Sequence, residues 1–414
     1  MLIQRSRQVL MFLQKALWVA LVALVPFSLT YVVVEPNAIT YLDIYCLTFL
    51  IISALNVVIG NLHLSKLKSR SFTWVIGVLL VAMVWGLVNT SPISNGYGLW
   101  VSRLSLPILI GYVTYLMAID KLINASTIAR TLLISTLLLG LSALMQYLGV
   151  IDYRTVDRIT GPYVTPNTLA RYVEVLLLMA LPWIISQKKY WYLLIWFVGL
   201  AVLIGTISYN GVITFFAGML IMVVSLPREH LAKRAKATIL TVMLLIAIFV
   251  GANVSSLPKY TTSINDSRLS RLEYWHVAWG AIKDHPLTGI GIKTWELTYP
   301  ELVVKYGEIP PRNWLSAQPH NVVLDAWLKA GLPGVVAVLA FLLWPVIAGF
   351  KLLRRAADSK YGWYYVSLMC SMTALLLFGV IDDPIWNDDI MLLVMVLDFF
   401  MVGQLFLRSE ELNA

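Results

Sequence analysis

His320 is the residue of this sequence best suited to act as a general base. It stands in the run Gln318-Pro319-His320-Asn321, directly before a long apolar stretch. An imidazole side chain titrates near neutrality, so it can accept a proton from a hydroxyl group at physiological pH. The alternative is a structural or helix-capping role. The other histidines are weaker candidates, because two fall on basic loops and two along or at the end of an amphipathic stretch: His63, His230, His276 and His285.

Several arginines could supply positive charge beside such a base. Residues 267–282 have helical periodicity, which places Arg268, Arg271 and Trp275 on one side. Guanidinium groups bind phosphate oxygens through paired hydrogen bonds, so these arginines are candidate phosphate ligands. The alternative is contact with lipid headgroups. Arg158 and Arg171 are further candidates, on either side of a Gly- and Pro-containing turn. Arg103 lies inside an apolar run, where it is either a functional residue or a side chain that snorkels to the membrane surface.

Carboxylates and amides complete the set of polar candidates. Residues 382–389 read Asp-Asp-Pro-Ile-Trp-Asn-Asp-Asp between two apolar stretches. Asp382 and Asp383 could orient a base, bind a cation or remain solvated. Asn167 follows the turn that begins at Gly161 and could cap the next helix. No DxD or EF-hand-like pattern is present, so the sequence predicts neither a dedicated metal site nor a cofactor.

The composition indicates an integral membrane protein. Of the 414 residues, 59% are hydrophobic and 13% are charged, whereas soluble domains carry about 25% charged residues. A membrane-spanning helix needs about 20 mostly apolar residues. Twelve such runs predict an all-α polytopic fold, with one membrane domain over residues 1–414: 16–34, 41–60, 72–89, 99–119, 131–150, 170–186, 190–207, 211–226, 237–255, 321–350, 363–381 and 390–407. The first run is not followed by a small-residue cleavage site, so it is expected to remain as a span.

The distribution of Lys and Arg predicts the orientation of these spans. If the N terminus is cytoplasmic, every cytoplasmic connection is basic, and four short external connections (35–40, 90–98, 208–210 and 382–389) contain no Lys or Arg. Both termini are therefore expected on the cytoplasmic side. The net charge of +9 then reflects this topology and gives no evidence for nucleic-acid binding. Residues 256–320 are expected to form a long external loop between spans nine and ten, with amphipathic helices. Cys46 and Cys370 both lie in apolar runs, which excludes a disulfide scaffold.

The order of the motifs resembles that of the O-antigen ligase/polymerase superfamily of bacterial membrane glycosyltransferases. The resemblance covers most of residues 70–400, and the stretch 285–334 is its most specific part. The matching segments are GPYVTPN (161–167), Arg271–Trp275, HPLTGIGIKTW (285–295), PHNVVLDAWLKAGLPG (319–334) and IDDPIWNDD (381–389).

This resemblance implies a GT-C-like fold in the bacterial inner membrane, with a glycan linked to undecaprenyl pyrophosphate as the donor. It implies metal-independent transfer of that glycan to a hydroxyl group on the periplasmic face. By motif, His320 falls at the family's essential histidine and Arg271 at the arginine of the long loop, the expected pyrophosphate ligand. Asp382 or Asp383 matches the acidic residue before the last span.

One position departs from the family pattern. The family usually has Ser-Arg-Gly at the external start of the eighth span, and here the chain reads Ser208-Tyr209-Asn210-Gly211. Asn210 cannot supply the missing charge, which leaves Arg103, Arg158 or Arg171 to do so. The polar residues expected to contact pyrophosphate or glycan are therefore these three arginines with Arg268, Asn167, Asn210 and Asn321.

The function predicted from the sequence is that of a polysaccharide ligase. It would transfer a preassembled glycan to a lipid A-core-type acceptor, surrounded by membrane lipids, with Arg271, Arg103 and Arg158 holding the pyrophosphate. The alternative within the class is a repeat-unit polymerase, which uses the same donor chemistry. A transporter or flippase is a less favoured alternative, because the sequence shows no internal repeat and its polar residues gather at one face.

Overall fold

Helices account for nearly all regular structure in the computed structural model of the chain. It describes residues 2–28, 31–33, 39–151, 158–225, 267–307, 309–355 and 362–413. Within these ranges the exception to the helices is a short antiparallel hairpin of β1 (Tyr31–Val33) and β2 (Ile39–Thr40). The predicted all-α class is confirmed.

Among the described residues, eight helical segments are long and apolar enough to cross a membrane. They are α1 (Leu2–Leu24), α2 (Tyr41–Val58), α3 (Arg70–Val88), the continuous run of α4 (Ile93–Trp100), a π-helical turn (Val101–Ser105) and α5 (Leu106–Ile119), then α6 (Ala125–Tyr147), α7 (Pro166–Ser186), α13 (Val322–Arg355) and α15 (Asp388–Asn413). Three shorter apolar helices overlap further predicted spans: α8 (Leu193–Gly205), α9 (Tyr209–Ser225) and α14 (Gly362–Phe378). The predicted span 237–255 lies outside the described residues.

The first span was placed too far along the chain by the apolar pattern. The prediction was 16–34, whereas α1 ends at Leu24 and is followed by a 3-10 turn, Val25–Phe27, and by β1. Pro26 explains the difference, because a proline within a helix removes a backbone donor and clashes with the preceding turn. The β-branched residues after it favour an extended chain.

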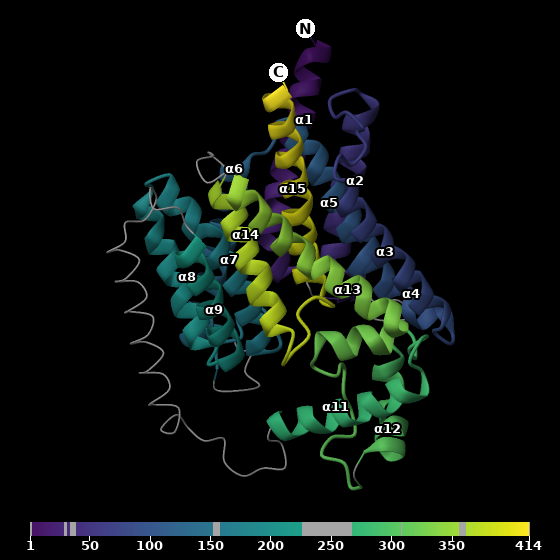
Figure 1. Cartoon of the computed structure of the whole chain (residues 1–414). Coiled ribbons are helices and arrows are strands. Elements are labelled where there is room, and N and C mark those ends of the chain that lie inside the picture. The colour runs from purple at the N-terminus through teal and green to yellow at the C-terminus, as the bar shows by residue number, and fades with distance from the viewer. Residues whose placement is uncertain are drawn as a thin grey trace.

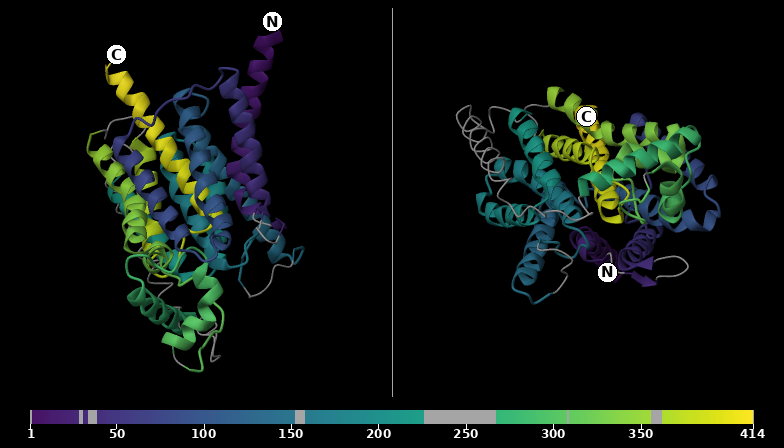
Figure 2. Two further views of the ribbon diagram at one scale, coloured as in Figure 1. Left: turned by 90° about the vertical axis from the view of Figure 1, so that its right-hand side faces the viewer. Right: turned by 90° about the horizontal axis from the view of Figure 1, so that it is seen from below.

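The two ends of the bundle differ in what they carry. The N and C termini lie at the same end, and α11 (Ser267–Asp284) and α12 (Thr294–Tyr306) lie at the opposite end (Figures 1 and 2). The helices α7, α14 and α15 are the most deeply buried, because α15 packs on α5 and α14 packs between α7 and α13. The end that carries α11 and α12 is therefore the one where loops can form a site over a rigid core.

The helix α11 divides its apolar residues between a buried cluster and the outer surface. Its apolar spacing predicts one face of Leu272, Trp275, Ala278, Trp279 and Ile282, which would lie on the membrane surface or on the bundle. Ala278 and Ile282 are buried in a cluster with residues of α12 and α13, whereas Leu272 is 57% and Trp279 46% exposed. The buried part of this face therefore packs against two helices.

A break in α13 attaches the α11–α12 unit to the bundle. Ala330 and Gly331 leave the helical conformation, and Gly331 has a φ of 66°. The turn after α11 packs into this break: the Ile290 amide donates to the Leu328 carbonyl at 2.7 Å, and the Leu332 amide donates to the Pro286 carbonyl at 3.0 Å. The break at Ala330 and Gly331 is thus the point where the α11–α12 unit docks on α13.

We expect Gly331→Ala to lower the free energy of unfolding by more than about 1 kcal/mol, because alanine is strained at positive φ. Its Cβ would also collide with the Leu287 carbonyl. Thermal unfolding in detergent measures the loss. The matched control is Gly77→Ala in α3, where a Cβ meets no atom within 4 Å. Equal melting temperatures for the two variants would contradict the assigned role of the break.

Candidate active site

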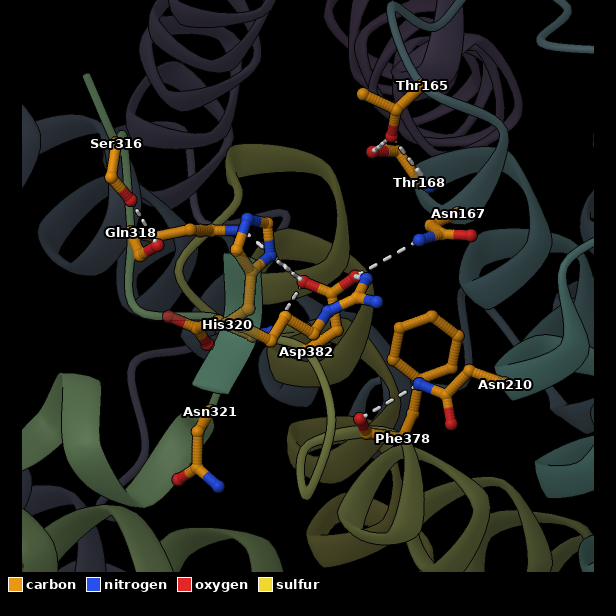
Figure 3. Close-up of polar contacts among 12 residues, drawn as sticks. Thr165, Asn167, Thr168, Asn210, Ser316, Gln318, His320, Asn321, Phe378 and Asp382 are labelled. Atoms are coloured by element: carbon orange, nitrogen blue, oxygen red, sulfur yellow. Dashed lines mark hydrogen bonds and ion pairs between the residues drawn. The ribbon is translucent and has the colours of Figure 1, made fainter. Parts of the chain in front are cut away.

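Asp382, in the loop between α14 and α15, is the centre of the polar residues at this end of the bundle. Its Oδ1 lies 2.9 Å from His320 Nδ1 and accepts hydrogen bonds from Gln318 Nε2 at 3.4 Å and from the Asp383 amide at 2.9 Å (Figure 3). An ionised carboxylate can only accept, so His320 Nδ1 carries the hydrogen and Nε2 is left as the basic nitrogen.

The second oxygen of Asp382 faces two other helices. Asn167 Nδ2, from α7, donates to Oδ2 at 3.5 Å, and Arg271 Nη2, from α11, lies 3.8 Å from it. Asn167 is itself held by Ser208, whose hydroxyl donates to the amide oxygen at 2.8 Å. The expected capping role of Asn167 is taken by Thr165, the side chain of which accepts from the Thr168 amide. Asn167 is therefore free to reach Asp382.

The backbone of His320 is held in an unusual conformation. Its φ is 53°, in the left-handed region that non-glycine residues rarely adopt. Trp275 Nε1 donates to its carbonyl at 3.4 Å, and the Tyr274 ring stacks on the imidazole with centroids 5.8 Å apart. Helix capping is done by the neighbouring Asn321, which accepts from the amides of Val323 and Leu324. Strained residues held by their surroundings cluster at functional sites.

Asp382 is ionised at neutral pH although it is buried. Burial raises the pKa of this carboxyl, but the hydrogen bond and charge of His320 and the charge of Arg171 outweigh burial and lower the pKa to about 2. A carboxylate that accepts an imidazole N–H fixes the tautomer and orientation of the ring and stabilises the imidazolium that forms on proton uptake. His320 and Asp382 therefore have the arrangement of an oriented general base.

The adjacent Asp383 has a different environment. Burial and the charge of Asp325 raise the pKa of Asp383 well above its ordinary value, while Lys329 lowers it. Lys329 forms an ion pair with Asp325 one helical turn away in α13. The sequence did not distinguish between the two aspartates, and the structure places Asp382, not Asp383, against His320.

The remaining predicted arginines lie at different places around this loop. Arg103, in the π-helical turn, pairs with Asp388 through Nε at 2.9 Å. Arg158 donates from Nε to the Thr206 carbonyl at 2.7 Å and from Nη2 to the Ile207 carbonyl at 2.9 Å, at the end of α8. Arg171 is buried in α7 and donates to the Asp383 carbonyl. The side chain of Arg268 lies outside the described residues.

Two predicted asparagines bind backbone instead of lying open. Asn210 Nδ2 donates to the Phe378 carbonyl at 3.1 Å, and Asn321 Nδ2 donates to the Val380 carbonyl at 2.9 Å. Both contacts fix the end of α14, from which the Asp382 loop starts. Gln318 and Ser208 were not predicted as site residues. The contact of Ser208 with Asn167 spans 41 positions, so no local pattern could have revealed it.

The family model described as O-Antigen ligase matches residues 175–339, from within α7 to within α13. Over this region the chain is O-antigen ligase-like. The match confirms the resemblance indicated by the motifs and includes both Arg271 and His320. No curated protein matches the chain.

The apolar helices indicate an integral membrane protein, and residues 175–339 are similar to a family of glycosyltransferase-like ligases and polymerases. One cluster of side chains brings together the imidazole of His320, the carboxylate of Asp382 and the guanidinium group of Arg271. In the described part of the chain, no group of three or more His, Cys, Asp or Glu side chains could hold a metal ion.

We expect Asp382→Asn to destabilise the protein at pH 7 by about 2–3 kcal/mol, and this difference should disappear on acidification. The pKa of Asp382 is lower in the folded protein, about 2, than in the unfolded chain, about 3.9. Its stabilising contribution is therefore complete above about pH 5 and is lost as the pH falls through about 2. Unfolding in detergent at several pH values tests this. The control, Glu296→Gln on exposed α12, should show no such trend, and a pH-independent difference for Asp382→Asn would refute the assignment.

Proposed function

We propose that the chain is an O-antigen ligase-type glycosyltransferase. It transfers a preassembled glycan from undecaprenyl pyrophosphate to a hydroxyl group of a lipid A-core-type acceptor, on the periplasmic face of the inner membrane. The observation that carries this proposal is the position of Asp382, which lies 2.9 Å from His320 and 3.8 Å from Arg271. One carboxylate thereby connects a general base with a phosphate-binding cation.

In the proposed reaction, His320 Nε2 accepts the proton of the acceptor hydroxyl. The hydroxyl oxygen forms a bond with the anomeric carbon of the glycan, and the bond between that carbon and the pyrophosphate oxygen breaks. Undecaprenyl pyrophosphate leaves with the bonding electrons. Asp382 stabilises the imidazolium that forms on His320.

Arg271 is the proposed ligand of the departing pyrophosphate. It projects from α11, the external helix that also contacts His320 through Trp275 and Tyr274. Its side chain is 18% exposed, so a ligand can reach part of it. A guanidinium group beside a base can neutralise charge as it develops on a leaving phosphate.

The proposed mechanism is metal-independent, and the proposed architecture is GT-C-like with both termini cytoplasmic. Both oxygens of Asp382 are already engaged by side chains of the protein. Asp383 faces Asp325 and Lys329 instead of the base. Arginine, not a cation held by these carboxylates, is therefore the proposed source of positive charge for the pyrophosphate.

We expect His320→Ala to reduce the rate of glycan transfer at least about 100-fold, because general base catalysis typically contributes that much. Arg271→Ala should cause a loss of about 100-fold or more, because one stabilising donor is removed from the leaving group. The assay is transfer from a purified lipid-linked glycan to its acceptor. Matched controls are His276→Ala, on the exposed side of α11, and Arg7→Ala near the N terminus. Full transfer by both site variants would exclude this mechanism.

Transfer is expected to continue after treatment with EDTA, because arginine side chains supply the positive charge. Initial rates with and without the chelator provide the measurement. A loss of activity that Mg²⁺ restores would contradict the metal-independent mechanism and direct attention to residues 382–389.

A further inference from the structure

Arg171 occupies an interior position directly behind the Asp382 loop. It lies on α7, is only 2% exposed, and donates from Nη1 to the Asp383 carbonyl at 3.0 Å. Asn167, which contacts the Asp382 carboxylate, precedes it by one helical turn on the same face of α7. Two consecutive turns of α7 thus contact two consecutive residues of the loop.

A polar contact on each side of Arg171 fixes α7 against α9. Toward the loop, the Ser208 hydroxyl donates to Asn167 at 2.8 Å; deeper in the bundle, the Thr214 hydroxyl donates to Glu174 at 2.6 Å. Asn167, Arg171 and Glu174 follow the i, i+4, i+7 spacing of a single helix face. These three residues form a buried polar seam, with Arg171 between Asn167 and Glu174. Because Asn167 and Glu174 are both hydrogen-bonded to neighbouring residues, the side chain of Arg171 is directed toward the Asp382 loop.

The two arginines near Asp382 differ in depth. Arg271 approaches from the external helix α11 and is 18% exposed, whereas Arg171 approaches from the bundle interior. A carboxylate placed this deeply is stable only if positive charge and hydrogen bonds compensate for lost water. The charge of Arg171 acts on Asp382 from the side that solvent does not reach, so a bound donor would compete with Asp382 for Arg271 but not for Arg171.

We propose that Arg171 is a positioning residue, which holds the Asp382 loop from inside the bundle and thereby keeps His320 oriented for proton transfer. This inference rests on the proposed function for its kinetic consequences, and on the structure alone for its effect on Asp382. It assigns Arg171 a role different from binding the pyrophosphate.

The first test measures the charge of Asp382 without any assay of transfer. The unfolding stability of Asp382 proteins is compared with that of Asp382→Asn proteins from pH 7 to pH 2, in three backgrounds: the native chain, Arg171→Lys and Arg171→Gln. The charged or titratable groups facing Asp382 are His320, Arg271, Arg171 and Asp383. The Arg171→Gln background lacks one positive charge, so the stability difference should disappear at a pH about one unit higher. The Arg171→Lys background keeps the charge and should preserve the original midpoint more closely.

The second test is kinetic. Arg171→Gln should lower kcat for glycan transfer about 10- to 100-fold, the usual range for residues that orient a functional group, with little change in KM for the lipid-linked donor. Arg171→Lys should retain more activity. Because Arg171 acts through Asp382, the double variant with Asp382→Asn should be no slower than Asp382→Asn alone. The matched control, Arg7→Gln, is remote from the loop and should leave kcat unchanged.

These measurements separate the possible failures. An increase in KM with unchanged kcat would assign Arg171 to donor binding and overturn the proposal. Additive losses in the double variant, or the same acid midpoint in all three backgrounds, would also overturn it. If His320→Ala and Arg271→Ala leave transfer intact, the proposed function fails, and the stability test still decides the role of Arg171.

Discussion

A single buried negative charge constrains the end of the bundle that carries α11 and α12. Asp382 has little access to water, and an uncompensated carboxylate at such a position would cost several kcal/mol. Four hydrogen-bond donors and one positive charge provide compensation: the imidazole of His320, the amides of Gln318 and Asn167, the Asp383 backbone and the guanidinium of Arg271. The loops and helices that carry these groups are therefore coupled, because a shift of any one of them would remove a contact from the buried carboxylate.

Local helix chemistry makes these donors available. Thr165 caps α7, which releases Asn167 toward the loop, and Asn321 caps α13, which releases His320 toward Asp382. The break at Gly331 lets the turn after α11 dock on α13, so that Trp275 and Tyr274 meet His320 from the outside. The helix α7 in the bundle interior and the helix α11 outside it thus contact the same loop from opposite sides. This arrangement suits the general base proposed for His320, because it restricts the orientation of the ring.

The sequence predicts the parts of this structure that depend on composition and local pattern. Long apolar runs reveal most helices, and the motifs single out His320, Arg271 and the Asp382–Asp383 pair. The sequence does not show which way a side chain points. Adjacent aspartates in a loop face different surroundings, and only the packing of α7, α11 and α13 determines which one meets the imidazole. The end of α1 was missed because the apolar run continues through Pro26, where the helix breaks. Hydrophobicity also does not specify a packing partner, so the apolar pattern of α11 did not show which of its residues are buried and which are exposed.

The structure shows what the uncharged Asn210 does at the position where the family pattern has an arginine. An arginine there would bring a positive charge from α9, whereas Asn210 binds the Phe378 carbonyl and helps to fix the start of the loop. The charge inside the seam comes instead from α7, through Arg171, between the Asn167–Ser208 and Glu174–Thr214 contacts. Because Arg171 is buried behind the Asp382 loop, its guanidinium group lies nearer to that loop than to any ligand bound at the surface. Losing one charge from α9 therefore need not weaken the base, because orientation of His320 depends on the charge behind Asp382, and that charge is supplied by a neighbouring helix.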